Sequence, residues 1–253
     1  MNNANIIETN QLTKSYSGFT AVSKLNMNVR KGTVYGFIGP NGAGKSTTMK
    51  MFLGLTQPTS GTFWIDGKSP ANRVAILREV GSLIEAPAFY GNLSGEENLD
   101  IVRRVLGLPK SSISDALELV GLAEHRKKLA KKYSLGMKQR LGLAGALIGR
   151  PPILILDEPT NGLDPVGIHE IRSLVRSLPQ QFACTVLVSS HLLSEVELMA
   201  DDIGILNRGA LLFEGTLQEL KKDASAKGYP TDNLEDTFLA IIESDNIKRG
   251  VKR

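Results

Sequence analysis

The segment GPNGAGKST, residues 39–47, has the residue types and the spacing of a loop that binds phosphate groups. Its glycines let backbone amides turn inward around phosphate oxygens, and the helix that follows points its positive end at the same place. Lys45 can reach the outer phosphates of a nucleotide, and the hydroxyl of Ser46 can hold Mg²⁺. The residues of this phosphate loop that we expect to contact the nucleotide are Gly39, Asn41, Gly42, Ala43, Gly44, Lys45, Ser46 and Thr47.

A second segment, ILILDEP at residues 153–159, supplies two neighbouring acids after an apolar run. Such a pair alone is commonly a solvated loop, but together with a phosphate loop it predicts hydrolysis of the nucleotide. Asp157 is expected to bind Mg²⁺, directly or through water. Glu158, beside the terminal phosphate, can accept a proton from the attacking water.

Two further polar residues follow apolar runs that predict strands. His191 comes after CTVLVSS and can orient the attacking water or bond the terminal phosphate. Glu85 comes after residues 82–84 and also ends an apolar run. Because ligands bind at the carboxyl ends of strands in α/β sheets, we expect both side chains near the phosphate loop. The other histidines, His125 and His169, lie in polar helical surroundings and are interpreted as surface residues.

A parallel sheet with helices between its strands would bring these residues together. Apolar runs and turn residues predict strands at residues 5–16, 21–29, 33–39, 61–67, 82–84, 152–157 and 184–190, and a closing hairpin at 201–215. Helical patterns occur at residues 46–55, through much of 92–148, and at 233–244 after a polar gap at 224–232. Strands on both sides of a helical block indicate one sheet-based core with an inserted helical subdomain.

The composition is that of an ordinary globular protein in a reducing compartment. Of the 253 residues, 42% are hydrophobic and 22% are charged, and the single cysteine, Cys184, excludes an internal disulfide. The first residues lack a basic segment followed by an apolar core, so we expect no signal peptide. No run approaches the ~20 apolar residues of a membrane span, so the chain is not expected to cross a membrane itself.

The formal net charge is +4, and much of the excess lies in RKKLAKK at 126–132 and KRGVKR at 248–253. A solvated surface is the simplest explanation of both runs. Nucleic acid or an anionic lipid surface would also attract them. No motif of nucleic-acid binding accompanies the charge, so we expect no nucleic-acid partner.

The segment YSLGMKQR, residues 133–140, lies between the phosphate loop and the two acids. Its serine can cap a helix N-terminus, which is a place where phosphate binds. The segment resembles, in degenerate form, the L-S-G-G-Q signature of the ATP-binding subunits of ABC transporters. Ser134 and Gly136 match this signature, Leu135 replaces the first glycine, and Met137 stands at the usual glutamine.

The resemblance extends from about residue 7 to residue 215 and implies an α/β fold. This fold is a P-loop NTPase core of the ABC ATPase type, with an N-terminal antiparallel β subdomain and an inserted α-helical signature subdomain. Residues 1–216 would form the ATP-binding domain, with the helical subdomain at about 86–148, and residues 217–253 a C-terminal helical tail. The implied ligands are ATP and Mg²⁺. The implied partners are a second copy in an ATP-sandwich dimer and separate transmembrane permease subunits. The chain itself would lie at the cytoplasmic face of the cell membrane.

The resemblance also assigns roles to single residues. Tyr16 matches the aromatic residue that stacks on adenine, and His191 matches the family's switch histidine. Ser134 and Gly136 would contact the ATP that the second copy holds. Asp164, in NGLDP, would contact the second copy across the dimer interface.

Glu85 stands where the family normally carries glutamine, a residue that contacts the Mg²⁺ site and moves with the transmembrane partner. LIEAPAFYGNLSGEENL, the signature segment and PTNGLDPVGI are together similar to the subfamily that handles bacitracin and lantibiotics, where glutamate stands at this position. Glu85 is therefore expected to be the residue that senses Mg²⁺ and couples to the partner, either by holding Mg²⁺ more tightly or by sensing loss of the terminal phosphate through repulsion. The alternative is a solvated loop acid far from the metal. Residues 86–92 would receive the partner's coupling helix, although Phe89 and Tyr90 could equally be local core.

The implied function is that of the ATP-hydrolysing subunit of a bacterial ABC exporter for peptide antibiotics, with a role in immunity or resistance. The alternative is a soluble ABC ATPase of translation or DNA repair. Such proteins usually carry two ATP-binding halves or a long coiled-coil insertion, and this sequence shows neither. A P-loop GTPase would show Asn-Lys-x-Asp, and a kinase would not need the signature segment. A module that only senses ATP would not need Lys45, Asp157, Glu158 and His191 together.

Overall fold

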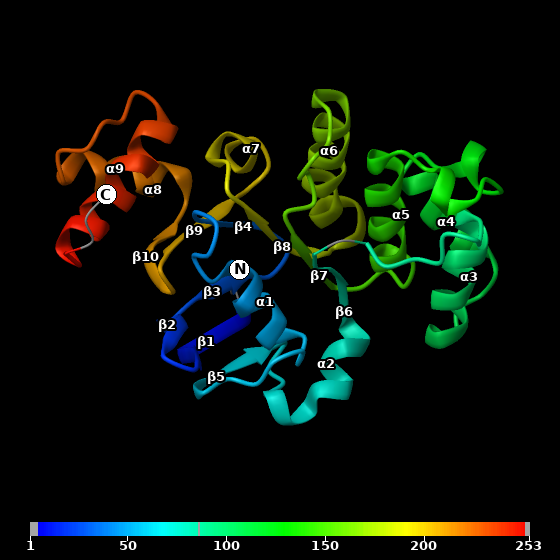
Figure 1. Ribbon diagram of the computed structural model, residues 1–253, viewed down its shortest axis with the longest axis horizontal. Coiled ribbons are helices and arrows are strands. Elements are labelled where there is room, and N and C mark those ends of the chain that lie inside the picture. The colour runs from blue at the N-terminus through cyan, green and yellow to red at the C-terminus, as the bar shows by residue number, and fades with distance from the viewer. Residues whose placement is uncertain (1–4, 86, 251–253) are drawn as a thin grey trace.

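A six-stranded sheet in the order β10-β9-β4-β8-β7-β6 runs through the middle of the molecule (Figure 1). The computed structural model describes residues 5–85 and 87–250. The strands of this sheet are β4 (Val34–Ile38), β6 (Val80–Leu83), β7 (Ile153–Asp157), β8 (Thr185–Ser190), β9 (Asp202–Asn207) and β10 (Ala210–Gly215). Neighbouring strands are parallel except β9 and β10, which form the hairpin predicted from the sequence.

A smaller antiparallel sheet covers one side of the first sheet. Its strands are β1 (Asn5–Tyr16), β2 (Phe19–Leu25), β3 (Asn28–Arg30) and β5 (Ser60–Ile65), and β1 pairs with the other three. The prediction of one strand at 21–29 was wrong, because β2 ends at Leu25 and β3 begins at Asn28. Lys24 of β2 and Gln11 of β1 have positive φ angles (48° and 50°), and they lie beside the register shift in the pairing of β1 with β2.

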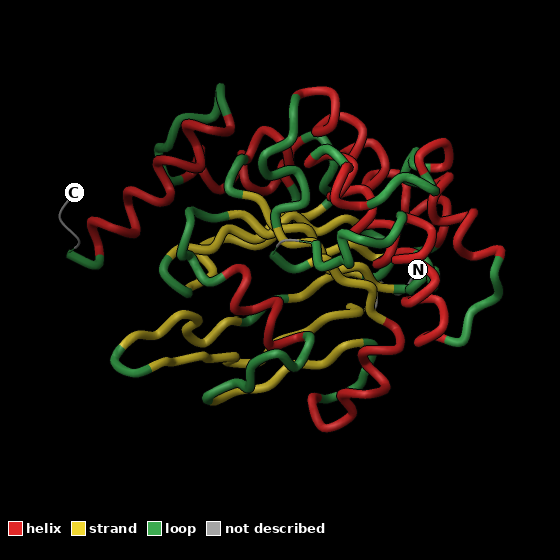
Figure 2. Tube along the Cα trace, turned by 45° about the vertical axis from the view of Figure 1, so that its right-hand side comes forward, coloured by secondary structure: helices red, strands yellow, loops and turns green. Residues whose placement is uncertain are grey.

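The central strands face two separate hydrophobic cores, because successive side chains of a strand point to opposite faces. Tyr35 and Phe37 of β4 belong to the core that also contains Met49 and Phe52 of helix α1 (Lys45–Phe52). Val34 of the same strand belongs to the core on the other face. Figure 2 shows the two layers of strands with helix α1 between them. The phosphate loop is therefore joined to a helix that both sheets hold in place.

The helices of the opposite face are α6 (Pro165–Phe182) and α7 (Leu193–Glu197). A helical block is inserted between β6 and β7, at one side of the molecule (Figure 1), and consists of α3 (Gly95–Leu106), α4 (Ser111–Leu119) and α5 (Leu135–Leu147). The remaining helices are α2 (Arg73–Glu79), α8 (Leu217–Ala226) and α9 (Leu234–Lys248). No helix in the part of the chain that the structure describes is long and apolar enough to cross a membrane.

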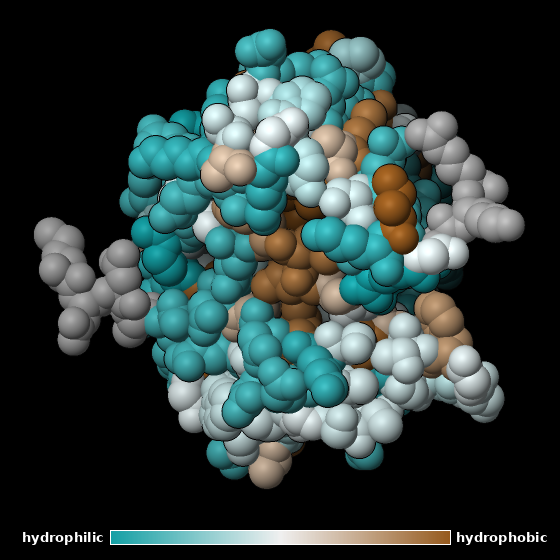
Figure 3. Space-filling model, turned by 90° about the vertical axis from the view of Figure 1, so that its left-hand side faces the viewer, coloured by the Kyte–Doolittle hydropathy of each residue, from teal (hydrophilic) through white to brown (hydrophobic). Residues whose placement is uncertain are grey.

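The C-terminal helices pack against the core rather than standing apart from it. Ala224 is fully buried in α8, so the polar gap predicted at 224–232 begins too early. Phe238 and Ile241 of α9 join the same core as the buried residues of α7. Figure 3 shows the side of the molecule that carries these helices, where hydrophilic side chains surround a narrow hydrophobic strip. The outer parts of the predicted domains, residues 1–4 and 251–253, and Ala86 lie outside the described residues.

Candidate active site

Three parallel strands end at one edge of the sheet, and each is followed by a predicted site residue. Ile38, the last residue of β4, lies beside Ser190 at the end of β8, and Asp157 at the end of β7 lies beside Ser189. The phosphate loop follows β4, Glu158 follows β7 and His191 follows β8. The register of the sheet therefore brings together three segments that lie far apart in the sequence, as the strand-end argument predicted.

The phosphate loop requires glycine because of its backbone shape and its close neighbours. Gly42 and Gly44 have φ angles of 78° and 108°, in the region where only glycine is free of strain. A Cβ atom on Gly44 would lie 2.4 Å from the carbonyl oxygen of Ala21. Helix α1 begins at the next residue, so its free N–H groups face the loop.

Lys45 is buried and reaches back across the phosphate loop. Its Nζ donates hydrogen bonds to the carbonyl oxygens of Gly39 (2.6 Å) and Pro40 (3.3 Å). Only 4% of the residue is exposed, and this burial lowers the pKa of Lys45, while the nearby carboxylate of Glu158 opposes the change. The lysine is thus already held beside the loop, with its charge on the side where outer phosphates would lie.

A pocket of about 270 Å³ lies against the phosphate loop and is partly aromatic. Its lining consists of Tyr16, Phe19, Ala21, residues 41–47 and Glu158. Tyr16 ends β1 with 48% of its surface exposed, and Lys14 places its ammonium 4.9 Å from the centre of that ring. The exposed ring of Tyr16 is available to stack on a flat base. Phe19, which was not predicted as a site residue, lies across the hairpin turn from Tyr16 and is also exposed.

Glu158 lies between the lysine of the phosphate loop and His191. One carboxylate oxygen, Oε1, is 3.5 Å from Nζ of Lys45, and the other, Oε2, is 2.9 Å from Nδ1 of His191. The φ angle of Glu158 is +47°, a strained value for a residue other than glycine. Such strain is typical of functional positions, where the surrounding contacts hold an unfavourable backbone.

Ser189, which was not predicted as a site residue, connects the two acids. The backbone N–H of Glu158 donates to Oγ of Ser189 (2.9 Å), and this hydroxyl donates to Oδ1 of Asp157 (2.6 Å). Asp157 is itself buried. Its carboxylate is therefore held in one orientation at the edge of the sheet.

The donors near the phosphate loop suit a magnesium ion that is bound mainly through a nucleotide. Among residues 5–85 and 87–250, no three His, Cys, Asp or Glu side chains gather into a group that could hold a metal alone. Asp157 and the hydroxyl of Ser46 offer only oxygen atoms, the ligands that Mg²⁺ prefers. Because Mg²⁺ commonly binds one or two protein oxygens together with phosphates and water, this donor set fits the ion.

Glu85 contacts Lys50 of helix α1. Its Oε1 accepts a hydrogen bond from the Lys50 ammonium (2.5 Å), and this bond lowers the pKa of Glu85. The φ angle of Glu85 is +61°, again in the strained region. The carboxylate is exposed, and the ion pair ties it to the helix that carries the phosphate loop.

The signature segment and the loop before α6 form a second region, separate from the pocket of the phosphate loop. Oγ of Ser134 accepts a hydrogen bond from the N–H of Met137 (3.3 Å) and so caps α5, and Asp164 caps α6 in the same way. An ion pair between Arg140 and Glu170 joins these two helices. Neither Ser134, Gly136 nor Asp164 lines the pocket of the phosphate loop.

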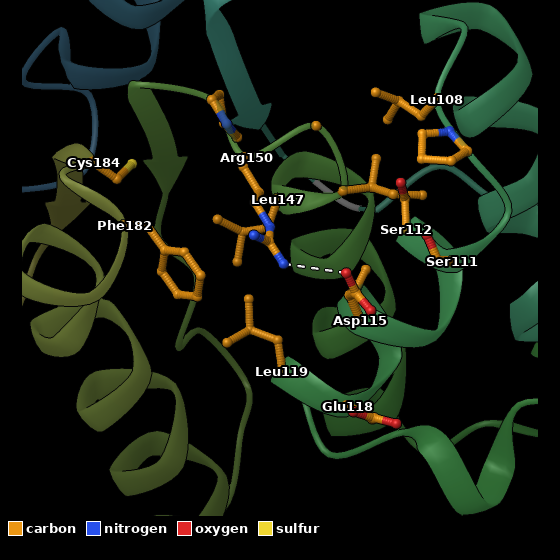
Figure 4. A pocket seen from close by; sticks show the side chains of 15 residues that line it. Leu108, Ser111, Ser112, Asp115, Glu118, Leu119, Leu147, Arg150, Phe182 and Cys184 are labelled. Carbon is orange, nitrogen blue, oxygen red and sulfur yellow. Dashed lines mark hydrogen bonds and ion pairs between the residues drawn. The ribbon is translucent and has the colours of Figure 1, made fainter.

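A cavity of about 600 Å³ is lined by α4, by the end of α5 and by Phe182 at the end of α6 (Figure 4). It opens beside Pro151 and Cys184, which precede the first residues of β7 and β8. Arg150 crosses it to contact Asp115 (3.1 Å) and lies over the ring of Phe182. This cavity contains none of the predicted site residues.

The parallel sheet, the glycine loop and the acids at the strand ends define a P-loop nucleoside triphosphatase. Among such proteins, the signature segment between the phosphate loop and the acids is typical of ABC ATPases. A family model described as ABC transporter matches residues 22–161, so the chain belongs to the ABC transporter family, as an ATP-binding, ATP-hydrolysing subunit.

Related proteins cover nearly the whole chain. The bacitracin transport ATP-binding protein BcrA of Bacillus licheniformis is 51% identical over 239 residues, which are 94% of this chain and 78% of that protein. The lantibiotic transport ATP-binding protein SrtF of Streptococcus pyogenes is 47% identical over 234 residues, which are 92% of this chain and 96% of that protein. A solved structure of an ATP-binding subunit of an ABC transporter has a TM-score of 0.82 and 28% identity, covering 93% of this chain and 99% of that one.

Proposed function

We propose that the chain supplies energy for the export of peptide antibiotics and so contributes to immunity or resistance. The observation that carries this proposal is the 51% identity to a bacitracin transport protein over 94% of the chain. The 47% identity to a lantibiotic transport protein supports the same class of cargo. The proposed place of action is the cytoplasmic face of the membrane, beside transmembrane permease subunits.

In the proposed reaction, the phosphate loop and Lys45 hold the phosphates of ATP, and Tyr16 stacks on the adenine. Asp157 and Ser46 would hold Mg²⁺, which neutralises phosphate charge when it is bound. Glu158 accepts a proton from the attacking water. His191, within hydrogen-bond distance of Glu158, orients this carboxylate and the terminal phosphate.

A second copy of the chain completes the site in this proposal. Ser134 caps helix α5 and Gly136 lies in its first turn, where free N–H groups can bind the terminal phosphate of the partner's ATP. Asp164 lies at the exposed start of α6 and would contact the second copy. Binding of two ATP molecules would close the dimer, and hydrolysis would open it.

An apolar groove beside Glu85 is the proposed contact with the permease. Its volume is about 560 Å³, and it runs between β6, α3 and α5. Several exposed hydrophobic residues line it: Leu55, Leu77, Tyr90, Ile101 and Leu106. Both predicted aromatics line the groove; Phe89 is partly buried and packs against the core, whereas Tyr90 is exposed. Asn98 holds the backbone of Tyr90 through both its N–H and its carbonyl oxygen (2.7 and 3.1 Å). A helix of the permease that faces the cytoplasm fits such a groove.

Co-purification tests the transporter role directly. We would tag the chain, solubilise membranes of its own cells in mild detergent, and identify the proteins recovered in stoichiometric amount. A polytopic membrane protein is the expected result, and substitution of Tyr90 and Ile101 by aspartate should abolish its recovery. Recovery with ribosomes or DNA, or recovery of the chain alone, would overturn the transporter proposal and favour a soluble ABC ATPase.

Replacing Glu85 with glutamine should change how ATPase activity depends on Mg²⁺. A carboxylate is a harder and more strongly charged ligand than an amide, so the variant should need up to about tenfold more Mg²⁺ for half-maximal rate, a difference of ~1.4 kcal/mol. The maximal rate should stay near that of the wild type. The measurement is phosphate release over a Mg²⁺ titration, with Glu79→Gln as the control acid from the neighbouring helix α2. Superimposable titration curves for Glu85→Gln and the wild type would show that Glu85 does not act on Mg²⁺ and serves only in its ion pair with Lys50.

A further inference from the structure

Glu195 is a buried acid that joins the two loops of the active site. It lies on α7 with 9% of its surface exposed. Its Oε2 accepts a hydrogen bond from Oγ1 of Thr160 (2.7 Å) and one from Oγ of Ser190 (3.1 Å). Burial of a carboxylate is unfavourable unless hydrogen bonds compensate for the lost water, and these two bonds supply that compensation.

The two hydroxyl groups come from the segments that carry the reacting side chains. Thr160 lies two residues after Glu158, and Ser190 lies directly before His191. Glu158 and His191 contact each other (2.9 Å). Together with Pro159, which links Glu158 to Thr160, these residues form a closed ring of six joined by covalent and hydrogen bonds, and Glu195 connects the two loops on the buried side.

The same hydroxyl group also supports the residue after the histidine. Oγ of Ser190 accepts a hydrogen bond from the N–H of Leu192 (3.0 Å), and its single proton lies within reach of both Glu195 (3.1 Å) and the carbonyl oxygen of Leu192 (3.2 Å). Both neighbours of His191 in the chain are thus held by one network. Glu197 lies on the same helix but is exposed, so the buried location of Glu195 reflects the face of α7 on which it lies.

We infer that Glu195 is a positioning residue for ATP hydrolysis, which sets the distance and orientation between Glu158 and His191. This inference rests on the proposed roles of those two residues. A base and its partner must be placed within a few tenths of an ångström, and a displacement near 1 Å can cost about a hundredfold in rate. Glu195 touches neither water nor phosphate in this scheme and acts only through Thr160 and Ser190.

The test compares four variants by steady-state ATPase kinetics: Glu195→Ala, Glu195→Gln, Thr160→Val and Glu197→Gln. Glu195→Ala should lower kcat by about tenfold to a hundredfold, with KM for ATP within about twofold of wild type. Glu195→Gln should recover most of the rate, because its amide oxygen can accept the same two hydroxyl groups. Thr160→Val, which removes one donor without changing shape, should fall between them. Glu197→Gln should behave as the wild type.

A second measurement separates positioning from simple damage to the fold. Binding of a fluorescent ATP analogue should be unchanged in Glu195→Ala, and in a Glu158→Gln background the alanine should add little further loss, because both changes act on one step. Three results would overturn the inference. They are a wild-type kcat in Glu195→Ala, a loss of ATP affinity in Glu195→Ala as large as its loss of kcat, or losses of kcat that add fully when Glu195→Ala is combined with Glu158→Gln. Full turnover by Glu158→Gln with slow turnover by Glu195→Ala would instead refute the proposed base.

Discussion

Replacing Glu158 with glutamine is expected to lower ATP turnover by about a hundredfold or more, while ATP still binds. Glutamine has nearly the same shape as glutamate, so the contact with His191 and the strained backbone at +47° can persist. Its amide cannot accept the proton of the attacking water. General-base catalysis typically contributes 10²- to 10⁴-fold to the rate, which sets the size of the expected loss.

The same variant should form a stable dimer with ATP and Mg²⁺, because hydrolysis is the step that opens the proposed sandwich. Phosphate release measures the rate, and size-exclusion chromatography with light scattering measures the dimer. Glu197→Gln, which changes an exposed acid on α7, is the matched control and should turn over normally. Turnover of Glu158→Gln at the wild-type rate would show that another group accepts the proton.

Replacing Lys45 with alanine should weaken ATP binding by about tenfold to a hundredfold. The ammonium is buried at the phosphate loop, and a charge-assisted hydrogen bond is worth ~1.5–3 kcal/mol. Burial lowers the pKa of Lys45, yet the carboxylate of Glu158 at 3.5 Å supports the charged form. Phosphate would add further negative charge, so the lysine should be charged whenever ATP is bound.

Isothermal titration calorimetry with ATP measures this loss. Lys31→Ala removes an equal charge from an exposed turn between β3 and β4 and should leave the affinity unchanged. The effect of Lys45→Ala should be much smaller for adenosine than for ATP, since adenosine has no phosphate to contact. An unchanged affinity for ATP would contradict the assignment of residues 39–47 as the phosphate-binding loop.

Most of the central sheet could be predicted from local sequence patterns. The runs at 33–39, 152–157 and 184–190 were predicted as strands and correspond to β4, β7 and β8. Since parallel strands end at one edge, the clustering of the phosphate loop, Glu158 and His191 could also be predicted. Helix α6 was missed, although Asp164 as a capping residue and Pro165 in the first turn are the ordinary signals of a helix start.

Other features depend on contacts between distant residues, so no local pattern could show them. The register shift in the pairing of β1 with β2 falls beside two left-handed residues, Gln11 of β1 and Lys24 of β2. The short helix α7 buries three of its five residues against the core, and its sequence alone is too short to show a period. The ion pair between Lys50 and Glu85 joins side chains 35 positions apart.

The reacting groups of this protein can thus be identified from short sequence motifs, because a phosphate loop or a pair of acids after a strand is recognised by residue type and spacing alone. The supporting contacts are different in kind. Ser189 is 32 positions from Asp157, and Thr160 is 35 positions from Glu195, yet each pair shares a hydrogen bond. Serine, threonine and glutamate are common in any chain, so their roles here come only from the register of β7 against β8 and the packing of α7, which bring these groups within 3 Å.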